Sequence, residues 1–159
     1  MRGKQAPKRK ITNDPKYNSP VVAKFINNIM EKGKKSVARK IVYTALDSIE
    51  ATSKKPAMEL FNLALTNVSP LLEVKSKRVG GANYQIPMQV RADRRQQLAF
   101  RWIITAARSK KGKPMAEKLA AVLGVGQLAG AKNLGDAVKK KQDVQRMAEA
   151  NRAFAHFAR

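Results

Sequence analysis

The side chains best suited to chemistry in this chain are cations, and the chemistry that they favour is phosphate binding. Three arginines recur every seven residues, so a helix through residues 93–108 would carry them on one face: Arg94, Arg101 and Arg108. The preceding residues 73–90 are predicted to form two short strands around a Gly80-Gly81 turn. The first strand is basic: Lys75, Lys77 and Arg78. A cationic hairpin followed by an arginine-striped helix predicts a nucleic-acid partner.

Each of these residues also has a purely structural interpretation. Arginines on a helix are often only its solvated face, but this helix has no glutamate four residues from any of the three to neutralise them. Trp102 lies among apolar neighbours and is predicted to pack in the core instead of stacking on a base. For Tyr84 on the second strand, packing and base stacking stay equally open. The run of Lys139–Lys141 near a helix start opposes the helix dipole, which favours an external anion over simple solvation.

Catalysis has little support in these residue types. The single histidine, His156, lies near the chain end among small and aromatic residues, so a contact role is expected. The acids are scattered without paired spacing, and there is no cysteine for thiol chemistry or a thiolate zinc site. The glycines at 124, 126 and 130 have the wrong spacing for a dinucleotide loop. We therefore predict a protein that is not an enzyme and has no cofactor, metal or small-molecule substrate.

The overall charge agrees with a polyanionic partner. Lysine and arginine number 33 against 11 acids, which gives a formal net charge of +22. The charge is concentrated, because residues 73–118 hold twelve cations and three acids, whereas residues 41–72 hold two cations and three acids. A near-neutral block beside a basic block indicates a folded domain with a charged face. No apolar run is long enough for a membrane span and no signal peptide is recognisable. The lack of cysteine fits a reducing cytoplasm.

The elements that must position these cations are mostly helices. Residues 1–18 are predicted to be a basic arm, with cations at Arg2, Lys4, Lys8, Arg9, Lys10 and Lys16. Residues 19–159 are predicted to be one all-α domain, a bundle of about six helices from which the hairpin of residues 73–90 projects.

The predicted helix boundaries follow capping and breaking residues. The first helix is expected from Ser19-Pro20 to Gly33, and the last from an Asp136 cap through Asn151. Glycines leave residues 124–135 without a predicted helix. Apolar residues at helical spacing are expected to be buried, among them Val37, Met58, Phe61, Trp102, Met115 and Met147.

Several sequence blocks stand out in chain order: Asp14-Pro15-Lys16-Tyr17, Lys24-Phe25-Ile26-Asn27, Gly33-Lys34-Lys35-Ser36, Glu73-Val74-Lys75, Lys77-Arg78-Val79-Gly80-Gly81, Tyr84-Gln85-Ile86-Pro87, Arg101-Trp102-Ile103, Met147-Ala148-Glu149-Ala150-Asn151 and Ala153-Phe154-Ala155-His156. Together, in this order, they resemble the small ribosomal subunit protein seven family in its bacterial form. The chain departs from the family pattern at residues 124–135, which are longer and richer in glycine.

The resemblance implies a structural constituent of the small ribosomal subunit. It would bind the 3′ major domain of the ribosomal RNA and nucleate assembly of the head. The hairpin and the C-terminal helix would lie near exit-site transfer RNA and the messenger path, with head and platform proteins as neighbours. The location would be a cytoplasmic ribosome, with an organellar ribosome as the alternative.

The resemblance also implies three groups of contact residues. Those for ribosomal RNA are Arg2, Lys4, Lys8, Arg9, Lys10, Lys34, Lys35, Lys75, Lys77, Arg78, Arg91, Arg94, Arg95, Arg101, Arg108, Lys110, Lys111 and Lys113. Those on the hairpin near transfer and messenger RNA are Lys77, Arg78, Gly80, Gly81 and Tyr84. Those at the C-terminus are Lys139, Lys140, Lys141, Arg146, Arg152 and His156.

Two other classes remain as alternatives. A free-standing architectural DNA or RNA binder would need the same positive charge without a partner assembly. A nucleic-acid enzyme would need clustered carboxylates to hold metal ions, and the acids of this chain are scattered.

Overall fold

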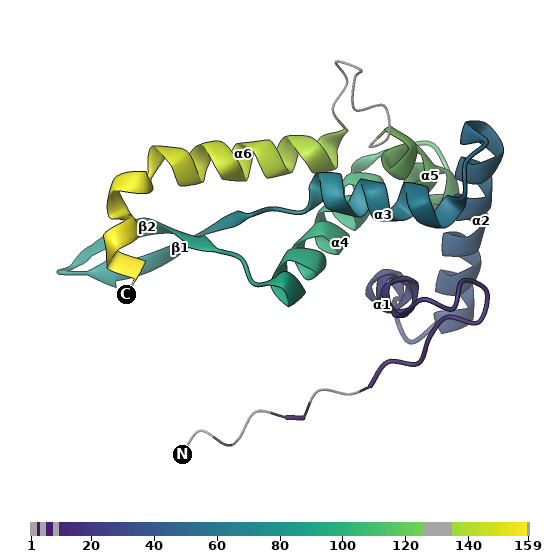
Figure 1. Cartoon of the computed structure of the whole chain (residues 1–159), viewed down its shortest axis with the longest axis horizontal. Helices are drawn as coiled ribbons and strands as arrows, with labels where there is room; N and C mark the ends of the chain where they lie inside the picture. Colours follow the sequence, from purple (N-terminus) through teal and green to yellow (C-terminus); the bar gives the residue numbers. More distant parts are fainter. Residues whose placement is uncertain (1–2, 4–5, 8–9, 126–134, 159) are drawn as a thin grey trace.

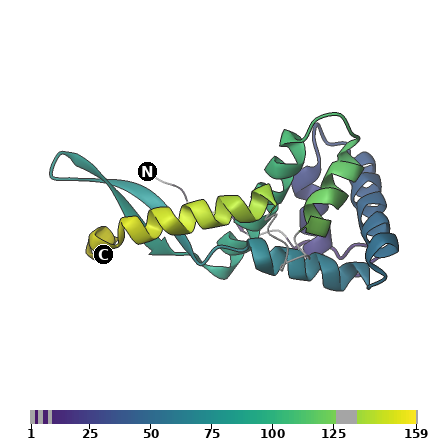
Figure 2. The same ribbon diagram turned by 90° about the horizontal axis from the view of Figure 1, so that it is seen from above.

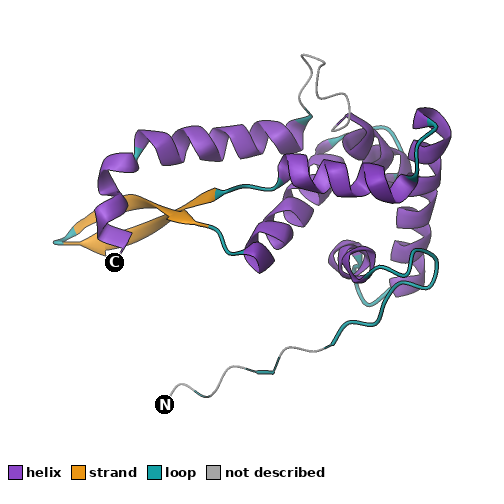
Figure 3. Cartoon of the chain, in the orientation of Figure 1, coloured by secondary structure: helices purple, strands orange, loops and turns teal. Residues whose placement is uncertain are grey.

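The computed structural model describes residues 3, 6–7, 10–125 and 135–158, and within them a helical body carries a long two-stranded hairpin (Figure 1). Figure 3 shows that the hairpin holds the two strands and that helices make up most of the remaining described chain. The elements in chain order are α1 Pro20–Ile29, α2 Lys35–Ser53, α3 Ala57–Val68, β1 Leu72–Val79, β2 Ala82–Gln89, α4 Ala92–Ser109, α5 Met115–Val125, α6 Asp136–Ala150 and the 3-10 helix η1 Arg152–Ala158. The predicted helical bundle with a projecting hairpin is confirmed.

Three phenylalanine rings lie at the centre of the helical body. The ring of Phe25 in α1 lies with its centroid 5.2 Å from the rings of both Phe61 in α3 and Phe100 in α4. All three side chains are almost fully buried. Apolar residues spaced three and four apart along each helix form the stripes that meet here. Helices α2 and α5 complete the same core through Leu46 and Leu119.

The burial predictions for two helices were partly wrong. In α2 the buried stripe is Ala38, Val42, Ala45, Leu46 and Ile49. Val37 is one residue away from the start of that stripe, about 100° around the helix, and is 52% exposed. In α6 the buried residues are Ala137 and Ala148, so the neighbouring Met147 turns outward and is 46% exposed. Met58, Trp102 and Met115 are half-buried and pack at the edge of the core, which gives Trp102 the packing role that its neighbours predicted.

Several predicted boundaries also shift. Helix α1 ends at Ile29 with Met30 as its C-cap, four residues before Gly33. Helix α5 continues through Gly124 to Val125, because a single glycine weakens a helix without ending it. Gly135 is the N-cap of α6, and Asp136 takes the first helical position, where its negative charge still interacts favourably with the helix dipole. The rest of the glycine-rich loop, residues 126–134, lies outside the described residues.

The hairpin has the turn that its glycines predicted. Gly80 and Gly81 both have positive φ, +57° and +89°, as a two-residue type I′ turn requires. The strands pair antiparallel, with Lys77 opposite Tyr84 and Lys75 opposite Ile86. Directly opposed side chains share a face, so these two lysines lie on the same face as the apolar residues of β2. The other face carries Ser76, Arg78, Asn83 and Gln85. Figure 2 shows α6 running alongside this hairpin, away from the helical body.

The end of the N-terminal arm is anchored to α2. Asp14 is 3% exposed, and its carboxylate accepts hydrogen bonds from the Tyr43 hydroxyl at 2.8 and 2.9 Å. The same carboxylate accepts bonds from the backbone N–H groups of Lys16 and Tyr17, at 3.1 and 3.2 Å. Burial, helped by the bond to Asp14, raises the pKa of Tyr43. Residues 14–17 therefore pack as part of the fold, although their composition alone resembles that of the free arm.

We expect the arm to divide into a dispensable and a stabilising part. Deleting residues 1–12 should leave the midpoint of thermal unfolding (Tm) unchanged, because the contacts of Asp14 remain. Asp14→Ala should lower the stability by about 1–3 kcal/mol, since it leaves the partly buried donors of Tyr17 and Tyr43 without their acceptor. At about 2–4 °C per kcal/mol for a chain of this size, calorimetry should resolve the loss. Equal Tm values for the two proteins would contradict the anchoring role of Asp14.

Candidate nucleic-acid interface

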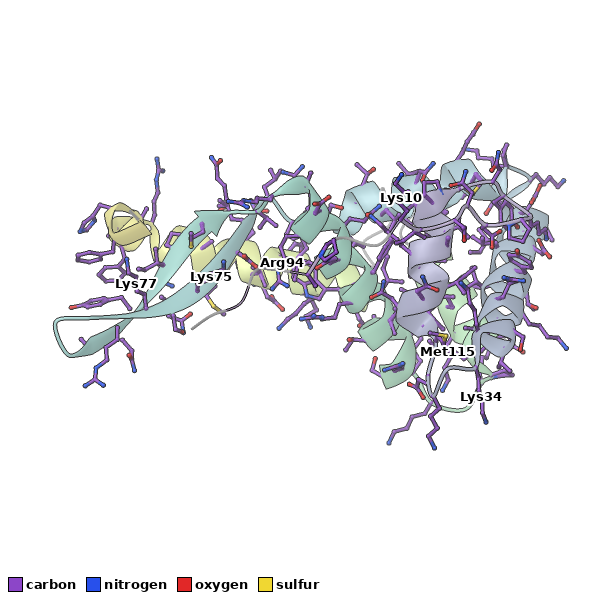
Figure 4. All side chains as sticks on the ribbon, turned by 90° about the horizontal axis from the view of Figure 1, so that it is seen from below. Lys10, Lys34, Lys75, Lys77, Arg94 and Met115 are labelled. Carbon is purple, nitrogen blue, oxygen red and sulfur yellow. The ribbon has the colours of Figure 1, made fainter. Side chains whose placement is uncertain are left out.

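The predicted contact cations come from several elements spread along the molecule. Figure 4 shows Lys75 and Lys77 on the hairpin, Arg94 near the middle, and Lys10 and Lys34 toward the helical end. Lys34 is the N-cap of α2, and Arg91 is the N-cap of α4. Lys110, Lys111 and Lys113 lie in the connection between α4 and α5. Four of the predicted arm cations lie outside the described residues: Arg2, Lys4, Lys8 and Arg9.

Acids from other elements partly neutralise the arginine stripe of α4. Arg94 Nε lies 3.3 Å from a carboxylate oxygen of Glu73 at the start of the hairpin. Arg108 pairs with Glu31 in the connection between α1 and α2. Lys75 also lies 3.4 Å from Glu73, whose side chain is only 15% exposed. The stripe lacks neutralising glutamates within its own helix, as the sequence indicated, but the fold brings such acids to both of its ends.

Other predicted contact cations keep their charge free for an external anion. Within residues 10–125 and 135–158, the following predicted contact cations form no ion pair: Lys10, Lys34, Lys35, Arg78, Arg91, Arg95, Arg101, Lys110, Lys111, Lys139, Lys140 and Arg152. Lys113 and Arg146 have only exposed partners three or four residues away: Glu117 at 3.9 Å and Asp143 at 3.8 Å. Exposed pairs of this kind contribute about 0–1 kcal/mol, so they yield readily to a phosphate.

The C-terminal tail covers the apolar face of the hairpin. The Tyr84 ring lies 5.1 Å from the Phe154 ring and 5.4 Å from the Phe157 ring, centroid to centroid. Lys77 Nζ donates a hydrogen bond to the carbonyl oxygen of Phe157 at 3.0 Å. His156 is exposed, and its ring centroid is 4.0 Å from that of Phe157. Tyr84 thus has the packing role. Its partners Phe154 and Phe157 belong to a tail that is apolar enough to dock, but the sequence did not show that this tail docks on the hairpin.

We expect the tail to hold the hairpin in shape. Replacing both Phe154 and Phe157 with alanine removes two aromatic contacts to Tyr84, each worth about 0.5–1.5 kcal/mol beyond area burial. Hydrogen exchange of the β1 and β2 amides should therefore accelerate by roughly tenfold. Tm should hardly change, because the core phenylalanines lie elsewhere. Arg152→Ala is the control, and equal strand protection in both variants would contradict this role of the tail.

One predicted C-terminal contact is directed into the protein. Lys141 Nζ donates a hydrogen bond to the carbonyl oxygen of Asn67 at 2.8 Å, in the last turn of α3. Burial lowers the pKa of this half-buried lysine. A cation at the C-terminal end of a helix interacts favourably with the helix dipole. Lys139 and Lys140 are exposed, so the external anion proposed for this run concerns them and not Lys141.

Two kinds of site were not found among the described residues: a membrane-spanning helix and a cluster of metal ligands. None of their helices is long and apolar enough to cross a membrane. Their histidine, aspartate and glutamate side chains form no group of three that could hold a metal ion.

Comparison with known proteins places this arrangement in a family. Residues 1–152 match the model of the family described as ribosomal protein S7p/S5e. The small ribosomal subunit protein uS7 of Roseiflexus castenholzii is 55% identical over 146 residues, which cover 92% of this chain and 90% of that protein. The uS7 proteins of Chloroflexus aurantiacus and Thermotoga maritima are 55% and 53% identical, over 96% and 99% of this chain and 94% and 99% of theirs. This chain belongs to the ribosomal protein S7p/S5e family.

Proposed function

We propose that this chain, as a structural and non-enzymatic constituent of the small ribosomal subunit, binds the 3′ major domain of ribosomal RNA and nucleates assembly of the head. The observation that carries this proposal is a set of cations that form no ion pair within the described residues and that lie on separate elements. They are Arg78 on the hairpin, Arg91 and Arg101 on α4, Lys34 and Lys35 at the start of α2, and Lys139 and Lys140 on α6. A folded RNA junction presents phosphates at many angles, so cations in several directions suit it better than one recognition helix.

The mechanism is scaffolding by charge and shape. Arg91, Arg95 and the loop at residues 110–113 would bind phosphates of one RNA helix, while Lys34, Lys35 and the arm would bind those of another. Neutralising both sets of phosphates on one rigid body holds the RNA helices at a defined angle. The family relationship supports a place in ribosomes, because its bacterial relatives are small ribosomal subunit proteins.

Sedimentation tests this proposal against a free-standing nucleic-acid binder. Tagged protein expressed in a bacterial host should sediment with the small subunit in a sucrose gradient and be scarce in the free fractions. The double charge reversal Arg91→Glu and Arg101→Glu should move it to the free fractions, because both side chains are exposed and unpaired within the described chain. The control Lys54→Glu with Lys55→Glu changes the net charge equally at the α2–α3 connection. Equal loss in both variants would argue for a non-specific electrostatic effect.

The hairpin and the C-terminal segments are proposed to lie near exit-site transfer RNA and the messenger path. Two features of the hairpin support this role. Its tip is formed by Gly80 and Gly81 without side chains, which permits close approach to an RNA backbone. The face opposite the C-terminal tail is exposed and polar, and Arg78, Asn83 and Gln85 lie on it.

A hairpin deletion should separate this role from RNA binding. Replacing Lys77–Gln85 with two glycines should leave the helical body folded, because Phe25, Phe61 and Phe100 lie outside the hairpin. Ribosomes with the deletion should hold exit-site transfer RNA poorly and shift reading frame more often, by footprinting and a frameshift reporter. The deletion also removes the contacts of Tyr84 with the tail. The triple variant Arg78→Ala, Asn83→Ala and Gln85→Ala keeps those contacts, and normal translation by both proteins would refute the hairpin role.

A further inference from the structure

A groove between α2, α4 and α5 lies at the end of the helical body where Figure 4 labels Lys34 and Met115. Its volume is about 350 Å³. Its apolar walls come from α1, α2 and α5: Ile29, Val37, Ala38, Ile41 and Met115. Its charged lining residues, Glu31, Lys34 and Arg108, are all exposed, so a ligand in the groove can reach them. An apolar hollow with a few charged groups is typical of a ligand site.

The walls contain a second apolar stripe of α2, beside the stripe that packs into the core. The core stripe starts at Ala38. Val37 and Ile41 are four residues apart, hence on one face of the helix, and both line the groove. Val37 is 52% exposed, and Ile41 and Met115 are half-buried. The protein therefore covers this stripe only in part, and a flat apolar group from a ligand would complete the cover.

The charges around the groove are mostly positive. Lys34, Lys35 and Lys111 are exposed and form no ion pair with any described residue. Arg108 pairs with Glu31, but their side chains are 50% and 69% exposed, and such a pair contributes only about 0–1 kcal/mol. Because α2 begins at the groove, its dipole adds positive potential. The ligand whose charge fits is an anion that carries an apolar or aromatic group.

We propose that the groove holds the base of one unpaired RNA nucleotide, with its phosphate between Lys34 and Arg108. The base lies against Val37, Ile41 and Met115, and a methionine thioether contacts aromatic rings favourably. These side chains contact the face of any base alike, so the groove selects an unstacked nucleotide and not a particular base. Proteins bind RNA at loops and bulges through such unstacked bases. The inference rests on the proposed RNA contact and names the point at which a base leaves its stack.

The position of the groove favours RNA over an acidic peptide. The groove lies between the cations at the start of α2 and the basic connection at residues 110–113, the two sets proposed above to hold separate RNA helices. A nucleotide that links two helices of a junction is unpaired and has a phosphate on either side, so it would meet cations in both directions. An acidic peptide with one apolar side chain would fill the groove but use only the cations next to it.

Nuclear magnetic resonance of side-chain methyl groups tests whether a base enters the groove. The probes are AMP, UMP and ribose 5-phosphate, which has the phosphate without a base. AMP and UMP should shift the methyl groups of Val37, Ile41 and Met115, because the ring current of a base acts at short range. Ribose 5-phosphate should shift only backbone amides near Lys34. AMP that leaves these methyl groups unshifted, or ribose 5-phosphate that shifts them as AMP does, would overturn the proposal.

Binding to the RNA itself gives a second test with a matched control. Val37→Ala should weaken binding to the 3′ major domain RNA by about three- to fivefold, because it removes two methyl groups from a half-covered apolar contact. The salt dependence should not change, because no phosphate contact is lost. Leu63→Ala removes an apolar side chain of similar exposure, 46%, on α3 outside the groove and should bind as wild type.

Photocrosslinking in the assembled subunit identifies what fills the groove. A photoreactive side chain in place of Lys40, an exposed residue one turn from Val37, should crosslink to one unpaired nucleotide. A crosslink to a protein or to a paired nucleotide would overturn the inference, as would equal RNA affinities of Val37→Ala and Leu63→Ala. These outcomes leave the proposed function standing. If wild-type protein does not prefer this RNA over unrelated RNA, the proposed function itself fails.

Discussion

RNA binding by this chain is expected to weaken by roughly 10³–10⁵ between 50 and 200 mM salt, if about 6–10 phosphates are contacted. The reason is counterion release, because each phosphate neutralised by lysine or arginine frees a condensed cation. The structure supplies exposed cations that form no ion pair with any described residue, among them Lys34, Arg91 and Arg101. A filter-binding or fluorescence titration at several salt concentrations gives the slope of log K against log salt.

Single substitutions refine this expectation. Arg101→Ala should reduce the salt slope by about 1, because it removes one phosphate contact. Arg94→Ala should reduce it less, because Arg94 already pairs with Glu73 in the free protein. A flat salt plot for the wild-type protein would refute the electrostatic account of binding, and equal slopes for the two variants would refute the distinction between paired and unpaired arginines.

Removing the central ring of the core should have the largest effect on stability. Phe25 is 0% exposed and contacts the rings of both Phe61 and Phe100. Phe25→Ala should cost about 3–5 kcal/mol, from lost apolar burial and the cavity left behind. At about 2–4 °C per kcal/mol, Tm should fall by roughly 6–20 °C in calorimetry.

An exposed apolar residue in the same body serves as the control. Leu63 in α3 is 46% exposed, so Leu63→Ala should change the stability by no more than about 0.5 kcal/mol. A similar fall in Tm for the two variants would mean that the core is not centred on the three rings. The expected contrast also makes Leu63→Ala a useful folded reference for the RNA measurements.

The sequence by itself determined the fold class, the turn of the hairpin and the excess of positive charge. Apolar residues spaced three and four apart mark helices, and two adjacent glycines between alternating strands mark a type I′ turn. These signals are local, because each depends on residues within one or two turns of each other. The excess of cations is a property of composition and needs no fold to be recognised.

Only the tertiary structure decided which charged and aromatic side chains have partners within the protein. Glu31 and Glu73 neutralise the ends of the arginine stripe, Tyr43 anchors Asp14, and Phe157 accepts a bond from Lys77. The partners in these contacts are between 21 and 80 residues apart. No local period encodes such a pair, because it depends on how complete elements pack.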